Sequence, residues 1–279
     1  MTGIMLTPYY SSFNHFQKHG TEFVQNTFSE IGWRLIYVFC IDLTISVFIR
    51  AFIIGKDRDS SHQGVFLFRN LPGRWFLLHS LWNIWIVFGT WEDFLKTIEK
   101  PSDAANKDRE YNLAPTFLSM ALHLYHCIAP WYAKSLNFQD LIHHVGFAIC
   151  GLGYMSLWYS WGPGANFAFF FLTGLPGAVD YFLLALVKWK KIHRNTEKKF
   201  NVIINNWCRG PGCVVAAAWT FVCYKEGIMD PPLFIVTAQL LLLVLNGQYY
   251  ASRVTRNYQM ILTSEEIRSP KTDRVKKLS

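Results

Sequence analysis

Two adjacent histidines, His143 and His144, are the residues whose chemistry stands out in this chain. They follow Asp140 and open a long apolar run. A neutral imidazole titrates near neutral pH, so it can take up a proton as a general base. A nearby carboxylate can orient such an imidazole or stabilise its charged form. Two adjacent imidazoles at the mouth of an apolar run are a costly use of residues, so the pair indicates a candidate functional site.

Two charged residues, Asp180 and Arg209, interrupt apolar runs further along the chain. Asn205 and Asn206 lie four and three residues before Arg209, so the three side chains share one side of a helix. Ionisable groups inside a membrane are costly and usually face a cavity or a partner. Proline and glycine interrupt the helix just before Asp180 and just after Arg209. Such a break either leaves backbone N–H and C=O groups without helical partners, so that they line a cavity, or only kinks the helix. We expect either a polar cavity with substrate-binding residues, or an Asp180–Arg209 pair that neutralises itself.

Counted from the ends of their runs, these polar groups all fall in the same half of the membrane. His79, His126 and Asn246 join them there, and His123 lies one turn before His126 on the same helix face. Independent structural polar groups would occupy both halves, so we expect one shared cavity that also contains His143 and His144. For His123 alone, an interhelical hydrogen bond is the simpler interpretation.

The composition identifies the elements that must position these residues. The 279 residues are 51% hydrophobic and 16% charged, whereas soluble chains carry about 25% charged residues. These values exclude a disordered chain, a coiled coil and a secreted disulfide scaffold. The six cysteines contain no C-x-x-C pair, so their spacing predicts neither a disulfide framework nor a zinc site. The chain is predicted to be a membrane protein.

A helix needs about 20 residues to cross the hydrocarbon core of a membrane. The candidate runs are Ile31–Gly55, Trp75–Trp91, Leu113–Ala133, Leu141–Ser160, Ala165–Trp189, Val202–Tyr224 and Pro232–Ser252. We predict an all-α polytopic bundle of six to seven transmembrane helices, and the first run, with three charged residues, decides between the two numbers. The expected divisions are an N-terminal arm over 1–30, an additional transmembrane helix over 31–55, a six-helix membrane domain over 72–256 and a basic tail over 257–279.

The net charge of +8 follows the same layout. With seven spans, 18 of the 27 Lys and Arg residues gather on the side of the C-terminus and 6 on the other. This bias predicts a cytosolic C-terminus and removes nucleic acid as an expected partner. Lys276 and Lys277 have the spacing of a dilysine retrieval signal, which favours the endoplasmic reticulum. The alternative location is the mitochondrial inner membrane, with the C-terminus in the matrix.

The run from Asp140 to His144 resembles the TLC-domain family, which includes the ceramide synthases and the translocating-chain-associated membrane proteins. In the synthases a His-His pair is followed, about one helix later, by two aspartates spaced D-x-x-D. Asp180 matches the second aspartate, whereas Gly177 stands where the first would be. Arg209 is similar to an arginine in the next helix, and the run from Gln239 to Tyr249 resembles the last span. The resemblance covers most of 72–256.

The resemblance implies TLC helices around a lipid-accessible cavity and an acyl-CoA-dependent N-acylation of a sphingoid-type amine. One histidine of the pair would be the general base, and Asp180 would orient an imidazole. The residues expected to bind substrate are Arg209, Asn205, Asn206, His126, His123 and Gln239. No metal or resident cofactor is implied; acyl-CoA would be a co-substrate, and the basic face suits its phosphates and anionic headgroups. Membrane lipids are the expected partners.

Three functions remain open at this point. The first is a lipid-handling TLC protein, either an acyltransferase or a lipid binder or sensor. The second is a non-catalytic TLC-fold accessory subunit of a large membrane complex, such as an organellar respiratory or ATP synthase assembly, with other membrane subunits as partners. The third is a metal oxygenase using His123, His126, His143 and His144, although membrane di-iron enzymes use more histidines than these.

Overall fold

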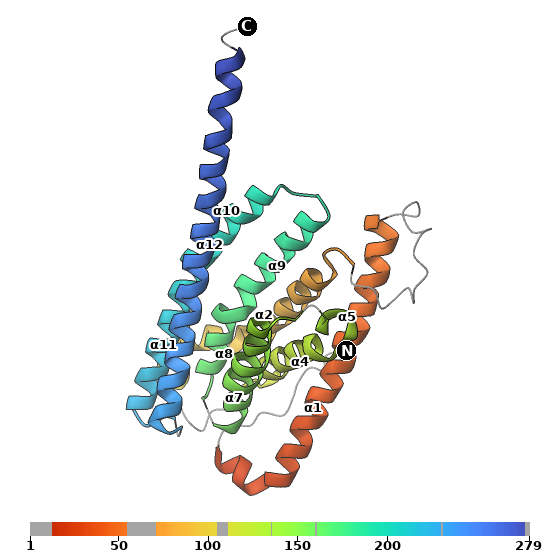
Figure 1. Cartoon of the computed structure of the whole chain (residues 1–279). Coiled ribbons are helices and arrows are strands. Elements are labelled where there is room, and N and C mark those ends of the chain that lie inside the picture. The colour runs from red at the N-terminus through yellow and green to blue at the C-terminus, as the bar shows by residue number, and fades with distance from the viewer. Residues whose placement is uncertain are drawn as a thin grey trace.

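The regular secondary structure of the described residues is all helical. The computed structural model describes residues 13–54, 71–104, 111–134, 136–159, 161–229 and 231–276, and gives only the backbone over 13–23 and 265–276. No strand occurs within these ranges. The all-α prediction is therefore confirmed for this part of the chain (Figure 1).

Several helices contain wide π-helical turns, written η, between α-helical parts. The first half of the chain contains α1 (Phe13–Phe48), η1 (Ile49–Ile54), α2 (Arg74–Glu99), α3 (Pro101–Ala104), α4 (Ala114–Ile128) and α5 (Pro130–Ala133). Next come α6 (Phe138–Leu141), η4 (Ile142–Tyr154), α7 (Met155–Trp158), α8 (Gly164–Phe169), η5 (Phe170–Gly174) and α9 (Leu175–Lys188). The last elements are α10 (Arg194–Ile204), η6 (Asn205–Arg209), α11 (Gly210–Lys225) and α12 (Leu233–Lys276).

Four of the helical stretches are long and apolar enough to cross a membrane. They are Val24–Ile53, Phe138–Trp158, Gly164–Lys188 and Leu233–Ser264. These stretches agree with an integral membrane protein. The predicted spans in α2, in α4 and in α10 to α11 do not meet the same standard of length and apolarity, and α4 has only 15 residues. The number of six to seven spans therefore stays a prediction.

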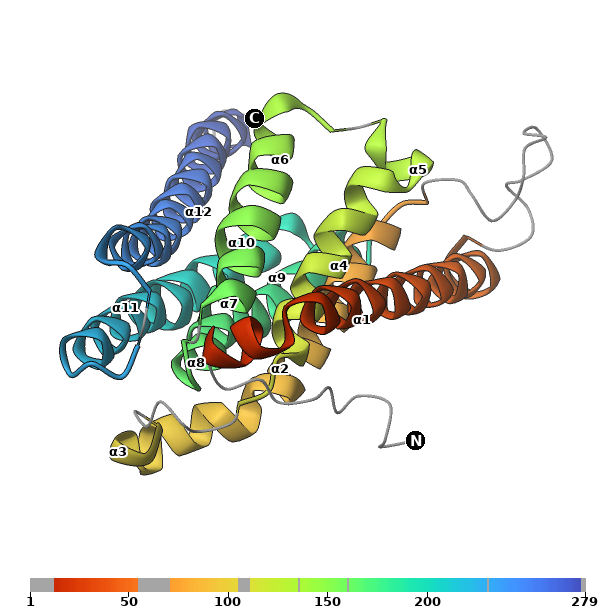
Figure 2. The ribbon, with the colours of Figure 1, turned by 90° about the horizontal axis from the view of Figure 1, so that it is seen from below.

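The position of α2 explains why this helix is less apolar than the outer ones. It packs against α1, α4, α8 and α9, and it lies among them in the views of Figures 1 and 2. Its buried polar residues include Arg74, His79, Ser80, Asn83, Thr90, Asp93 and Thr97. Because neighbouring helices rather than lipid surround this face, polar side chains on it find partners.

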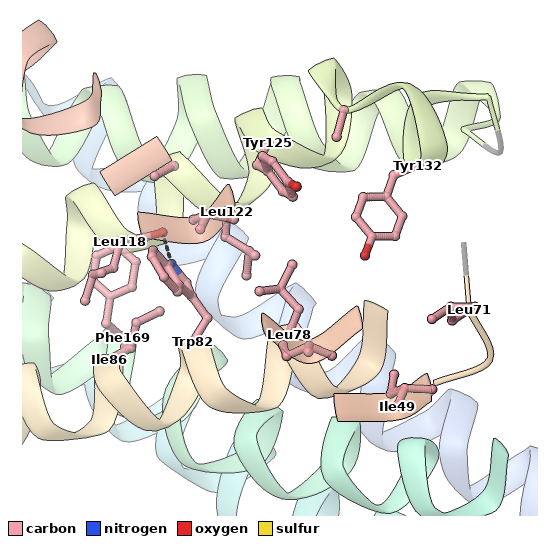
Figure 3. Close-up of a cluster of buried hydrophobic side chains, with 14 residues drawn as sticks. Ile49, Leu71, Leu78, Trp82, Ile86, Leu118, Leu122, Tyr125, Tyr132 and Phe169 are labelled. Carbon is pink, nitrogen blue, oxygen red and sulfur yellow. Dashed lines mark hydrogen bonds between the residues drawn. The ribbon is translucent and has the colours of Figure 1, made fainter. Parts of the chain in front are cut away.

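A hydrophobic cluster holds α1, α2 and α4 together (Figure 3). Trp82 of α2 lies at its centre, is fully buried, and donates its indole N–H to the carbonyl of Leu118 at 2.5 Å. Leu78 and Ile86 flank Trp82 on the same helix face, and Phe169 of α8 packs against them. Within a membrane such packing stabilises mainly through van der Waals contact, because lipid tails are as apolar as these side chains.

The ends of the chain differ from the predicted divisions. The first helix begins at Phe13, inside the arm expected over 1–30. The last helix runs without interruption past residue 256 to Lys276, a length of about 66 Å at 1.5 Å per residue. Figure 1 shows its C-terminal part extending beyond the other helices. Lys277, the second lysine of the predicted retrieval signal, lies outside the described residues.

Candidate functional site

Five histidines from three helices form one cluster inside the bundle. His79 comes from α2, His123 and His126 from α4, and His143 and His144 from η4. The ring centre of His144 lies 4.3 Å from that of His126 and 5.2 Å from that of His123. The rings of His123 and His143 are 5.7 Å apart. The structure thus brings together His123, His126, His143 and His144, because α4 packs against η4. His79, which the sequence placed in the same half of the membrane, joins them through His126.

Backbone carbonyls fix two of these rings. Nδ1 of His123 lies 2.7 Å from the carbonyl oxygen of Ser119, and Nδ1 of His79 lies 3.1 Å from that of Trp75. A ring nitrogen next to a carbonyl must carry the proton, so in each neutral ring Nε2 keeps the lone pair. Nδ1 of His126 and Nδ1 of His144 are buried without a hydrogen-bond partner among the described residues. The cluster therefore contains imidazole nitrogens that are free to accept a proton or bind a ligand.

The histidine pair lies near one end of a candidate span. His143 and His144 occupy the second turn of the stretch Phe138–Trp158; His144 is buried and His143 is half-buried. Asp140, the expected companion of the pair, forms a capping box with Asn137: each side chain accepts the other residue's backbone N–H, at 3.0 and 3.1 Å. Asp140 thus begins the helix that carries the two histidines.

Asp180, Asn205 and Arg209 form a second buried cluster between α9 and η6. Asn205 donates to Oδ2 of Asp180 at 3.1 Å and accepts from Nη1 of Arg209 at 2.7 Å. The Arg209 guanidinium lies 3.7 Å from the same carboxylate oxygen. The geometry therefore contains the Asp180–Arg209 pair, with Asn205 bridging it. Within the described residues, Oδ1 of Asp180 and Nε of Arg209 have no hydrogen-bond partner.

Aromatic rings connect the two clusters. Tyr181 follows Asp180 on α9, and its ring centre lies 4.5 Å from that of His79. The guanidinium of Arg209 lies over the ring of Tyr250, 4.9 Å from its centre. Asp180 makes no hydrogen bond to His143 or His144 among the described contacts, so the predicted orienting role would have to act through this intervening layer.

The side chains of the other two residues predicted to bind substrate, Asn206 and Gln239, hydrogen-bond to neither cluster within the described residues and instead join helices to one another. Asn206 donates to the Thr255 hydroxyl at 3.1 Å and so joins η6 to α12. Gln239 of α12 donates to the carbonyl of Gly151 at 2.5 Å. Gln239 also borders a small cavity of about 30 Å³ together with Ser156 and Thr220. This volume is enough for a water molecule but not for a lipid chain.

A third polar cluster was not expected from the sequence. Asp42 of α1 pairs with Arg74 of α2 through two 2.7 Å hydrogen bonds, and both side chains are fully buried. Three ring donors complete the carboxylate: Tyr125 at 2.7 Å, Tyr132 at 2.8 Å and Trp131 at 3.1 Å. With five donors on one carboxylate, this cluster is satisfied internally. Figure 3 shows Tyr125 and Tyr132, which also belong to the apolar cluster.

The sequence shows the two charged residues of this cluster but not their pairing. Asp42 is one of the three charged residues in the first apolar run, and Arg74 directly precedes the second run. What identifies them as partners is the packing of α1 against α2, which the sequence does not show. Trp75 connects this cluster with the histidines, since its ring lies 4.6 Å from Tyr132 and 3.8 Å from His126.

Comparison of the chain with family models, with curated proteins and with solved structures found no match. The functional argument therefore rests on the geometry of the site.

Proposed function

We propose that this chain is a lipid-handling integral membrane protein of the TLC type that transfers an acyl group from acyl-CoA to a sphingoid-type amine. The observation that supports the proposal is the buried imidazole of His144, whose Nδ1 has no hydrogen-bond partner within the described residues and whose ring lies beside those of three other histidines. A membrane protein gains nothing for folding from such a group, because a polar atom buried without a partner is costly.

The chemistry assigned to the site is amide formation. The lipid amine attacks the thioester carbonyl, a C–N bond forms and the C–S bond breaks. His144 or His143 takes up the proton that the amine loses and returns it to the leaving CoA thiolate. A neutral imidazole can do both at neutral pH. Arg209 and the positive cytosolic face would attract the CoA phosphates, while the acyl chain stays in the membrane. We place this activity in the endoplasmic reticulum, with the C-terminus in the cytosol.

The test is an acyl-transfer assay on the full chain purified into nanodiscs, with long-chain acyl-CoA and a sphingoid base, and mass spectrometry of the lipid product. We expect amide product from the wild type and a loss of about 100-fold or more in His144→Ala, because a general base contributes about 10²- to 10⁴-fold. His193→Ala, which changes an exposed histidine before α10, serves as the matched control and should keep full activity. Wild-type protein without turnover would contradict the proposal.

A specific feature favours the alternative of a non-catalytic accessory subunit in a large membrane complex. The C-terminal part of α12 extends away from the other helices of the described structure as one continuous helix (Figure 1). Partners in such an assembly would cover this helix. We expect a chain that ends at residue 256 to keep its unfolding temperature but lose any co-purifying subunits. Unchanged co-purification after this truncation would remove the support that α12 gives to this function.

A further inference from the structure

We propose that His123, His143 and His144 form a binding site for one divalent transition-metal ion of the zinc class. Each of the three residues offers one ring nitrogen, and these nitrogens all lie within 4.8 Å of one another. Two helices supply them: His123 comes from α4, and the pair comes from the first turn of η4. Three imidazoles on two packed helices are a ligand set that a zinc-class ion uses when one position stays open for water or substrate.

The hydrogen bond of His123 prepares this residue as a ligand. Its Nδ1 lies 2.7 Å from the Ser119 carbonyl, so this nitrogen carries the proton and Nε2 carries the lone pair. Histidines that bind metals almost always donate their other ring N–H to a carbonyl or carboxylate, which fixes the orientation of the ring. Ser119 thus supplies the outer contact that a metal site needs.

His144 supplies the second argument, because its buried Nδ1 lacks a hydrogen-bond partner among the described residues. A buried polar atom without a partner is costly, and a bound ion in the triad would compensate the site through the imidazole lone pairs. The other two histidines of the cluster have a different explanation. His79 and His126 both pack against the ring of Trp75, at centre distances of 3.7 and 3.8 Å. His126 shares the unpartnered Nδ1, but the ring nitrogens that lie within 4.8 Å of one another among the described residues are those of His123, His143 and His144.

The size of the triad fits a small ion after a modest closure. Neighbouring nitrogens around tetrahedral zinc are about 3.3 Å apart, given Zn–N distances of about 2.0–2.1 Å. The three ring nitrogens would therefore approach one another by up to about 1.5 Å, which side-chain rotation can provide. Imidazole ligands suit zinc, copper, iron and nickel, whereas magnesium and calcium prefer oxygen. No carboxylate or thiolate belongs to the triad.

This inference goes beyond the proposed acyl transfer and does not depend on it. A bound ion would occupy lone pairs of His143 and His144, and it would lower the pKa of a bound water, so that a hydroxide on the ion would be the proton acceptor near the site. Metal binding can be measured without any substrate. Failure of the metal test would leave the acyl-transfer assay unaffected, and the reverse also holds.

The experiment uses the full chain in nanodiscs, purified without a metal resin, stripped with a chelator and titrated with Zn²⁺ alone or Co²⁺ alone. We expect about one ion per chain and the visible absorption bands of tetrahedral Co²⁺. His123→Gln, His143→Gln and His144→Gln should each weaken binding more than about 100-fold. Loss of a residue that only supports a ligand costs about 10- to 100-fold in metal affinity, and these variants lose the ligand itself. His193→Gln should bind like the wild type.

One further variant keeps the test decisive if a glutamine variant fails to fold. His123→Cys retains a metal ligand and should add a sulfur-to-cobalt charge-transfer band. The wild type should lack this band, because none of its six cysteines belongs to the triad. Wild-type protein that binds no stoichiometric Zn²⁺ or Co²⁺ would overturn the proposal. So would His144→Gln binding as tightly as the wild type, or a His123→Cys variant that binds cobalt without the sulfur band.

Discussion

At the scale of single residues, the chain uses its buried charges in two ways. The Asp42 carboxylate has five donors, including Arg74, so its charge is fully compensated. Asp180 and Arg209 are bridged by Asn205, yet each keeps a polar atom without a partner within the described residues. The first arrangement is what a structural ion pair requires. The second leaves hydrogen-bonding capacity for a ligand.

We predict that Asp42→Asn destabilises the protein by about 3–5 kcal/mol, because it leaves the buried Arg74 guanidinium without its counter-ion. Chemical unfolding in detergent measures this change. Glu92→Gln is the matched control: it removes one acid of an i,i+4 pair with Lys96 that is largely exposed, where the expected cost is below about 1 kcal/mol. Equal effects of the two substitutions would show that Asp42 is not the structural anchor inferred here.

A second prediction concerns Gly177, which stands where the resemblance expects an aspartate. A Cβ at this position would lie 2.5 Å from Nδ2 of Asn83, and Asn83 is buried and accepts from the Thr173 hydroxyl at 2.8 Å. Gly177→Ala should therefore cost about 1–3 kcal/mol through overpacking between α2 and α9, and Gly177→Asp more. The control is Gly32→Ala, because a Cβ at Gly32 meets nothing within 4 Å. Thermal unfolding of the variants decides, and a stable Gly177→Asp would contradict the close approach of the two helices.

At the scale of elements, π-helical turns carry much of the candidate chemistry. The histidine pair lies in η4, and Asn205 to Arg209 make up the whole of η6. Such turns are rare and often occur at functional sites, where they change the direction of side chains. In η6 the change turns Asn205 toward α9 while Asn206 contacts α12.

We predict that Asn205→Ala costs about 1–3 kcal/mol, because it leaves groups on Asp180 and Arg209 unsatisfied in a buried site. Asn206→Ala is the control on the same turn; it loses one 3.1 Å bond to the half-buried Thr255 and should cost about 0.5–1.5 kcal/mol. Denaturation by chemical unfolding compares the two. If Asn206→Ala were the more damaging variant, the bridging role of Asn205 would be wrong.

The sequence predicted some of these elements because apolar length and composition are local properties. The four long apolar helices and the all-α class follow directly from them. The position of the histidines on α4 and η4 could be anticipated from depth along each run. By contrast, the Asp42–Arg74 pair, the π-helical turns and the contact at Gly177 depend on which helices meet and how closely. Such information is distributed over the packed structure and has no local pattern.

At the scale of the whole molecule, α2 packs its buried face against α1, α4, α8 and α9, while Leu81, Phe88 and Trp91 of the same helix are exposed. This position explains how a helix with buried Arg74, His79 and Asn83 can belong to a membrane protein. Polar groups there face other helices and not lipid. Its buried polar residues also lower the apolarity of α2, whose predicted span is not among the four that are long and apolar enough to cross a membrane. Helices in the middle of a bundle need less apolar surface than those that face lipid.

The predicted topology gives the last test. Seven spans with positive residues on the cytosolic side place the two ends of the chain on opposite sides of the endoplasmic reticulum membrane. The natural sequence contains no N-x-S/T glycosylation site, so an added one reports luminal exposure without background. We expect glycosylation of a site fused to the N-terminus and none of a site fused to the C-terminus. Absence of glycosylation at both ends would favour six spans. A glycosylated C-terminus would contradict the orientation. The basic face proposed to attract the CoA phosphates would then lie in the lumen, whereas the proposal requires it in the cytosol.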